Sequence, residues 1–116
     1  SCNISKGENE IIEYLKKEKI NFLKQHRFQD CRFKNPLPFG FYLPDYYTCI
    51  EYDGEQHFKS VKYWGGDEGL KERQIKDKIK TEYCKIKQIK LFRIKYNDNI
   101  EDKLKEIFTI AYLLLK

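Results

Sequence analysis

The chain has 116 residues and a formal net charge of +5 at pH 7, with 35% charged and 16% aromatic residues. This length suits a single domain over 1–116, and the aromatic content excludes an intrinsically disordered chain. No apolar run approaches the roughly 20 residues of a membrane span, and no signal-peptide pattern is present. We therefore expect an intracellular protein without a membrane partner, in the cytoplasm or nucleus of a host or encoded by a virus or phage. The modest basic charge fits a polyanionic partner without requiring one.

The predicted elements form a mixed α/β chain in the order helix, three strands, helix, strand, helix. The first helix, over 6–18, is indicated by a capping box in which Ser5 is followed three residues later by Glu8. The later elements are strands over 20–28, 39–43 and 46–53, a helix over 67–87, a strand over 89–96 and a helix over 100–115, with turns at RFKNPLP (32–38) and at Pro44-Asp45.

Apolar positions predict which faces of the later helices are buried. In the 67–87 helix the predicted buried stripe is Ile75, Ile79, Tyr83 and Ile86, and lysines occupy the other faces. The apolar face of the last helix ends in Ala111, Leu113, Leu114 and Leu115.

The cysteines do not form a complete zinc site, because no CxxC pair is present. Three of them lie in or beside apolar patterns and are predicted to be buried thiols: Cys31, Cys49 and Cys84. Cys2 has two interpretations, either a disordered terminal cysteine or the last ligand of a zinc ribbon that lies upstream of this sequence.

The chemically suggestive cluster lies at the end of the third predicted strand. Alternate residues of a strand share a face, so Glu51 and Asp53 point the same way, and His57 follows closely. Two carboxylates and an imidazole provide ligands for a hard divalent cation and a general base, which phosphodiester hydrolysis needs. The alternative is a charged strand end beside a turn. For one residue alone that alternative is better, but for the whole cluster we favour the chemical reading.

A longer pattern surrounds this cluster. The stretch PFGFYLP…YTCIEYDGEQHF is preceded by SKGE and followed by ERQIKDKIKTEYC and IKLFRI. It resembles the very-short-patch-repair-like branch of the PD-(D/E)XK nucleases, and within that branch the EDxHD homing endonucleases. The resemblance runs from Ser5 to about Tyr96, and IEYDGEQHF is its most specific part. It implies a restriction-endonuclease-like core, Mg²⁺ or Mn²⁺ as cofactor and double-stranded DNA as substrate.

The resemblance also implies roles for individual residues. Glu8 would help to hold a metal-bound water, His57 would act as general base or orient the phosphate, and Asp53 and Asp77 would be acidic site residues. The Glu51-Tyr52 segment would bind metal through either a carboxylate or a main-chain carbonyl, and both options stay open.

Gly40 departs from the family pattern, which has phenylalanine-aspartate-phenylalanine at 39–41 with the aspartate as central metal ligand. The predicted metal positions, Gly40, Glu51, Tyr52 and Asp53, therefore lack one carboxylate. Either the glycine was introduced to stop cleavage, which we favour, or the site has decayed naturally. In both cases we expect a chain that binds DNA but cleaves little of it.

Basic and aromatic residues beyond the hairpin are predicted DNA contacts. The lysines of 71–90 suggest a face that follows phosphates, although a solvated helix would look the same. Arg93 and Lys95 could contact the backbone, and His26 is interpreted mainly as a surface histidine. The predicted contact residues are Lys59, Lys62, Trp64, Arg73, Lys76 and Lys80.

Two alternatives to a homing or mobile-element endonuclease stay open. One is a non-catalytic DNA-binding module that keeps a decayed nuclease fold, and the other is a structure-selective nuclease such as a junction resolvase. Asp45, which follows Pro44, is interpreted as a turn residue rather than a site carboxylate.

Overall fold

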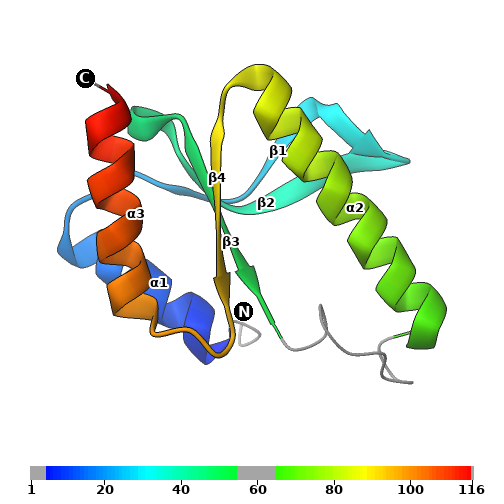
Figure 1. Ribbon diagram of the computed structural model, residues 1–116, viewed down its shortest axis with the longest axis horizontal. Helices are drawn as coiled ribbons and strands as arrows, with labels where there is room; N and C mark the ends of the chain where they lie inside the picture. The colour runs from blue at the N-terminus through cyan, green and yellow to red at the C-terminus, as the bar shows by residue number, and fades with distance from the viewer. Residues whose placement is uncertain (1–4, 55–64, 116) are drawn as a thin grey trace.

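The computed structural model describes residues 5–54 and 65–115 (Figure 1). It confirms the mixed α/β class, as an α+β fold with one four-stranded mixed sheet and three helices. Within these residues, no helix is long and apolar enough to cross a membrane. The elements are α1 (Lys6–Lys17), β1 (Leu23–Phe33), β2 (Asn35–Leu43), the 3-10 turn η1 (Pro44–Tyr46), β3 (Thr48–Asp53), α2 (Gly66–Lys87), β4 (Lys90–Lys95) and α3 (Ile100–Leu115).

The strands lie side by side in chain order, β1-β2-β3-β4. β2 is antiparallel to both β1 and β3, whereas β3 and β4 are parallel and are joined through α2. Antiparallel pairing sets Phe41 opposite Ile50, so the next residues along, Gly40 and Glu51, are neighbours. Parallel pairing brings the ends of β3 and β4 to the same edge, with Asp53 opposite Lys95.

The helices cover opposite faces of the sheet (Figure 1). The larger core lies between the sheet and α1 and α3, and it includes Ile11, Leu15, Ile50, Ile94 and Leu104, none more than 1% exposed. The smaller core lies under α2 and is made of Cys31, Leu37, Phe39, Cys49 and Cys84. These three cysteines are free and buried, as predicted.

The N-terminal capping box is present as predicted. The Ser5 hydroxyl accepts a hydrogen bond from the Glu8 N–H at 3.2 Å, and the Glu8 carboxylate accepts one from the Ser5 N–H at 3.3 Å. Asp45 lies in η1 and accepts a hydrogen bond from Asn21 at 2.9 Å, which agrees with its interpretation as a turn residue.

The predicted boundaries of the first two strands are wrong. Instead of 20–28 and a turn over 32–38, β1 continues to Phe33 and β2 begins at Asn35, with Lys34 alone between them in the left-handed region at φ 68°. The prolines suggested a turn, but β3 pairs only with residues 41–43 of β2. The segment of β2 that carries the prolines therefore has one free edge, where the missing N–H is tolerated.

The predicted buried stripe of α2 is wrong for two of its four residues. Ile75 is 49% exposed and Ile86 77% exposed, while Ile79 and Tyr83 are half-buried. Cys84 is the fully buried residue of this helix. The end of α3 differs too: Ala111 is buried, but three leucines predicted on the apolar face are exposed, Leu113, Leu114 and Leu115.

Candidate functional site

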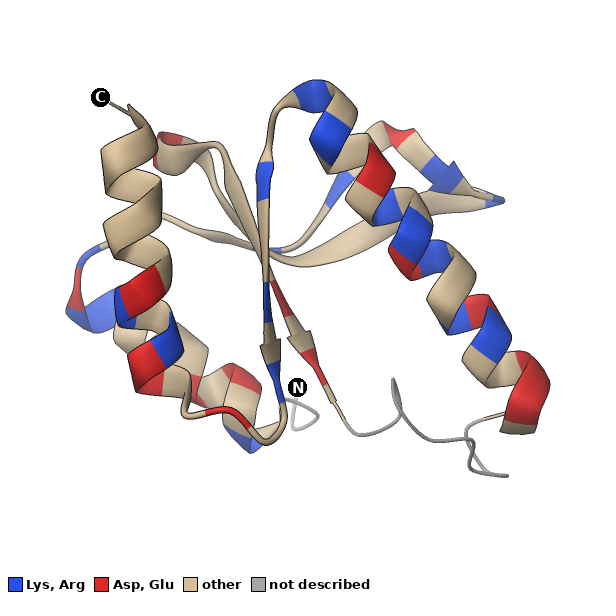
Figure 2. Ribbon diagram, in the orientation of Figure 1, with Lys and Arg blue, Asp and Glu red and all other residues tan. Residues whose placement is uncertain are grey.

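Glu51 and Asp53 lie on the α2 side of β3, as the strand alternation predicted. Glu51 is 8% exposed and Asp53 6%, which is unusually low for carboxylates. Ile50 and Tyr52, which alternate with them, pack on the opposite face with the larger core. Figure 2 shows the acidic stretches of β3 next to the basic stretches of β4, with α2, which carries many Lys and Arg residues, to one side of them.

The carboxylate of Glu51 is held by two donors. One oxygen accepts from the Lys80 ammonium of α2, and the other accepts from the backbone N–H of Gly40. The Lys80 ammonium also donates to the Pro38 carbonyl at 2.9 Å and lies 5.1 Å from the centre of the Phe39 ring. Because the side chains of Lys80 and Glu51 are 12% and 10% exposed, this ion pair is largely shielded from water.

A second ion-pair group lies next to it. The Arg93 guanidinium of β4 donates to the Asp77 carboxylate at 2.5 Å and to the Thr81 hydroxyl at 2.6 Å. It also lies 3.9 Å from the Asp53 carboxylate. Asp77 thus faces the sheet and binds Arg93, rather than its helical neighbours. We call the five charged residues of both groups the charged cluster: Glu51, Asp53, Asp77, Lys80 and Arg93.

Gly40 lies where β2 turns over. Phe39 packs in the core under α2, whereas Phe41 packs in the core under α1 and α3. These two residues flank Gly40 and would share one face in a regular strand. A Cβ atom at position 40 would lie 3.3 Å from a Glu51 carboxylate oxygen and 3.3 Å from the Ile50 carbonyl oxygen. Any side chain here would therefore be directed at Glu51, and these neighbours would have to shift by a few tenths of an ångström.

The described residues do not fit a divalent cation as they are arranged. Among residues 5–54 and 65–115, no group of three His, Cys, Asp or Glu side chains is placed to hold one. Both oxygens of Glu51 already accept hydrogen bonds, and one donor is itself a cation. His57, which was predicted to complete the site, is outside the described residues.

Glu8 is not brought to the charged cluster. Its carboxylate binds Ser5 in the capping box, and its charge acts on Tyr52, one of the predicted metal positions. Burial, followed by the charges of Glu8 and Glu10, raises the pKa of Tyr52 above its ordinary value. The Tyr52 ring lies against Gly7 on the α1 side of β3, so Glu8 is on the opposite face of the sheet from Glu51.

Three of the six predicted DNA contacts come together. Arg73, Lys76 and Lys80 line a cavity of about 230 Å³ between α2 and the Leu37-Pro38 segment of β2. The predicted contacts outside the described residues are Lys59, Lys62 and Trp64.

The pairing of Lys80 with Glu51 and of Asp77 with Arg93 was missed in the sequence. A signal was present, because residues 73, 77, 80 and 84 are spaced by four, three and four along a helix, which puts them on one face. Three of the four residues on that face are charged. The apolar stripe on the other side of the helix was therefore predicted to be the buried one.

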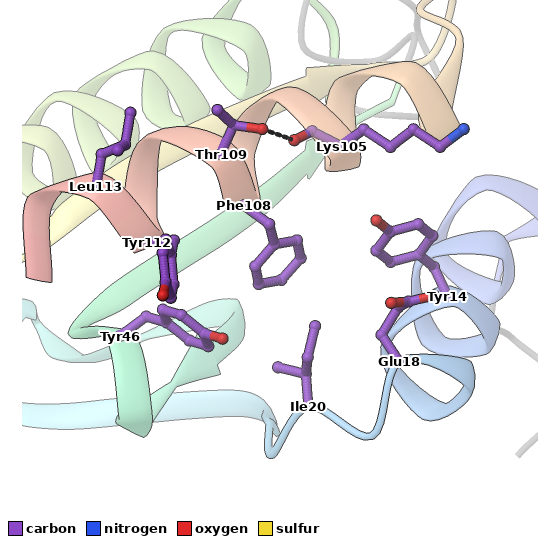
Figure 3. A pocket seen from close by; sticks show the side chains of 9 residues that line it. All are labelled: Tyr14, Glu18, Ile20, Tyr46, Lys105, Phe108, Thr109, Tyr112 and Leu113. Carbon is purple, nitrogen blue, oxygen red and sulfur yellow. Dashed lines mark hydrogen bonds between the residues drawn. The ribbon is translucent and has the colours of Figure 1, made fainter.

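A second hollow lies on the other side of the molecule and was also not predicted. Figure 3 shows Tyr14 and Glu18 of α1, Tyr46 of η1 and Phe108 and Tyr112 of α3 around it, with a volume of about 550 Å³. The Tyr14 and Phe108 rings stack at 6.0 Å, and Tyr46 meets Phe108 edge-on at 5.6 Å. These rings pack against one another.

Comparisons of the chain with protein-family models, with curated proteins and with solved structures found no match. The charged cluster beside Gly40, with the basic cavity next to it, is therefore what this fold itself offers as a candidate site.

Proposed function

We propose that the chain is the catalytic domain of a metal-dependent DNA endonuclease with a restriction-endonuclease-like core, in which glycine at position 40 leaves the metal site incomplete. In this form it binds double-stranded DNA and cleaves it weakly or not at all. The observation that carries the proposal is the direction of a Cβ atom at Gly40, which would lie 3.3 Å from a carboxylate oxygen of Glu51.

Position 40, Glu51 and Asp53 would form the acidic part of such a site. An aspartate at 40 would set a second carboxylate against Glu51, with Asp53 further along the same face of β3. Bound Mg²⁺ or Mn²⁺ would supply charge neutralisation at the phosphate and an activated water. With glycine, the two carboxylates that are left are balanced by Lys80 and Arg93.

DNA binding is supported by the basic cavity beside this site. Arg73 and Lys76 lie on the sheet-facing side of α2 and line the cavity, together with Asp77 and with Lys80, which is paired with Glu51. Cations in such a position neutralise phosphates, and affinity then falls as salt displaces them. The duplex backbone would be held next to the acidic end of β3, which is where cleavage needs it.

The test is plasmid nicking by this chain, by Gly40→Asp and by the matched control Gly40→Asn, each with Mg²⁺ or Mn²⁺. Asparagine has nearly the same volume as aspartate but no charge, so it separates the carboxylate from its bulk. We expect nicking by Gly40→Asp alone. No activity in any variant with Mn²⁺ present, or equal activity in all three, would refute the assignment of position 40.

A second candidate is a DNA-binding module without catalytic function, and one observation favours it: Lys80 already satisfies the charge of Glu51. In that case Gly40→Asp stays inactive, while DNA binding is retained. Fluorescence anisotropy with a duplex should show that Lys76→Ala weakens binding and lowers the slope of log affinity against log salt by about 1.

A further inference from the structure

We infer that Lys80 is an internal cation that takes the place of a divalent metal ion at Glu51, and that removing its positive charge gives this chain metal affinity even with glycine at position 40. The inference rests on the proposed function only in treating Glu51 as a position where metal would bind.

The ammonium of Lys80 has the surroundings of a bound cation rather than of a surface lysine. It donates to the Glu51 carboxylate and to the Pro38 carbonyl, the latter at 2.9 Å, and it faces the Phe39 ring at 5.1 Å. A carboxylate and a main-chain carbonyl are oxygen ligands of the kind that hard divalent cations take. The lysine side chain is 12% exposed, so bulk water reaches this cation poorly.

Competition between the two cations follows from charge and space. A divalent ion that uses the same Glu51 oxygen would lie within a few ångströms of the ammonium, and like charges at that distance repel strongly in a shielded site. Lys80 is covalently attached and therefore always present. With glycine at position 40, where Glu51 has no second carboxylate beside it, a metal ion gains access to the Glu51 and Pro38 oxygens only when the ammonium leaves or loses its charge.

Two substitutions test whether the effect depends on the charge of Lys80 in particular or on any lysine of α2. Lys80→Met keeps an unbranched side chain and removes the charge, which leaves Glu51 as a largely buried carboxylate without its cationic partner. Lys78→Met makes the same chemical change on the exposed, outward side of the same helix and is the matched control. A double variant, Lys80→Met with Glu51→Gln, removes the anion that would attract the metal.

The measurement is Mn²⁺ binding to the purified chain, followed by electron paramagnetic resonance of free Mn²⁺ and by Tm with MnCl₂ added. For Lys80→Met we expect saturable binding and, at ten times the Kd, a rise in Tm of about 4 °C or more. The chain as given, Lys78→Met and the double variant should show neither effect. If Lys80→Met does not fold without metal, Lys80→Gln is used, because its amide is uncharged but is a hydrogen-bond donor.

Absence of Mn²⁺ binding in both uncharged Lys80 variants would overturn the inference, as would binding that the Lys78→Met control matches. Neither result depends on DNA or on an aspartate at position 40. Failure of Gly40→Asp to nick DNA would instead count against the proposed function, so the two can fail separately.

Discussion

The two faces of the sheet are built from different chemistry. The face under α1 and α3 is an apolar core whose buried residues are at most 8% exposed. The face under α2 has a small apolar core next to β1 and β2, followed by the charged cluster toward the ends of β3 and β4. Burying charges in pairs is not in itself a source of stability, because desolvation offsets their attraction. The comparison indicates that apolar packing dominates one face, whereas the other combines a small apolar core with the charged residues on which the proposed function depends.

Helix α2 shows the same division on a smaller scale. Its sheet-facing side carries Arg73, Asp77 and Lys80, while Ile75 and Ile86 point away from the sheet. A helix that only had to cover a sheet would be turned the other way, because apolar burial is the larger stabilising effect. Instead, the polar side of α2 faces the sheet, where it pairs with the charged residues of β3 and β4.

The largest effect on stability is expected from the apolar face. Leu104 is 0% exposed, and Leu104→Ala should lower the free energy of unfolding by about 2–5 kcal/mol. Leu114 lies on the same helix but is 62% exposed, and Leu114→Ala should change the free energy of unfolding by less than about 0.5 kcal/mol. Urea denaturation measures both, and equal losses would show that the end of α3 is covered in solution.

On the charged face, removal of one partner should cost less than loss of a core leucine. Arg93→Met removes the cation that lies 2.5 Å from the Asp77 carboxylate. It also removes a positive charge 3.9 Å from the Asp53 carboxylate. We expect a loss of about 1–3 kcal/mol, measured by urea denaturation at neutral pH. Lys95→Met on the same strand is the control, since Lys95 is exposed. A loss no larger than in this control would show that the cluster does not need Arg93.

The edge of the α2 face predicts a pH dependence. Burial, followed by the hydrogen bond of 2.7 Å to Asp30, raises the pKa of Tyr83 above its ordinary value. Because the folded pKa is the higher one, the stability due to neutral Tyr83 is complete below the unfolded pKa of about 10 and is lost as pH rises further. Stability measured from pH 9 to about 11 should fall less steeply in Tyr83→Phe, while Tyr47→Phe, at an exposed site, keeps the original slope.

The smallest effect is expected on the outward side of α2. Ile86 is 77% exposed, so Ile86→Ser should change the free energy of unfolding by less than about 0.5 kcal/mol. Cys84 is buried on the opposite side of the helix. Cys84→Ser should lower the free energy of unfolding by more, because the serine hydroxyl would enter an apolar core. Thermal denaturation compares the two, and the reverse order would mean that the outward side is buried against a partner.

Local patterns in the sequence were sufficient for several features. The Ser5–Glu8 capping box predicts the start of α1, because the cap depends on residues three apart in the chain. Strand alternation predicts that Glu51 and Asp53 share a face, and Pro44-Asp45 predicts the turn between β2 and β3. The mixed α/β class follows from these elements. Each of these depends on neighbours within a few residues.

The tertiary structure decided which surfaces meet. Helical periodicity gave α2 two opposite faces, and the burial of one of them depended on the charges that β3 and β4 present to it. The same holds for the Lys80–Glu51 pair, whose members are 29 residues apart, and for the position of Gly40 beside Glu51, which depends on strand register. Side-chain partners at such distances are set by packing of whole elements. Local sequence patterns show which residues share a face, as they do for residues 73, 77, 80 and 84, but not which surface that face meets.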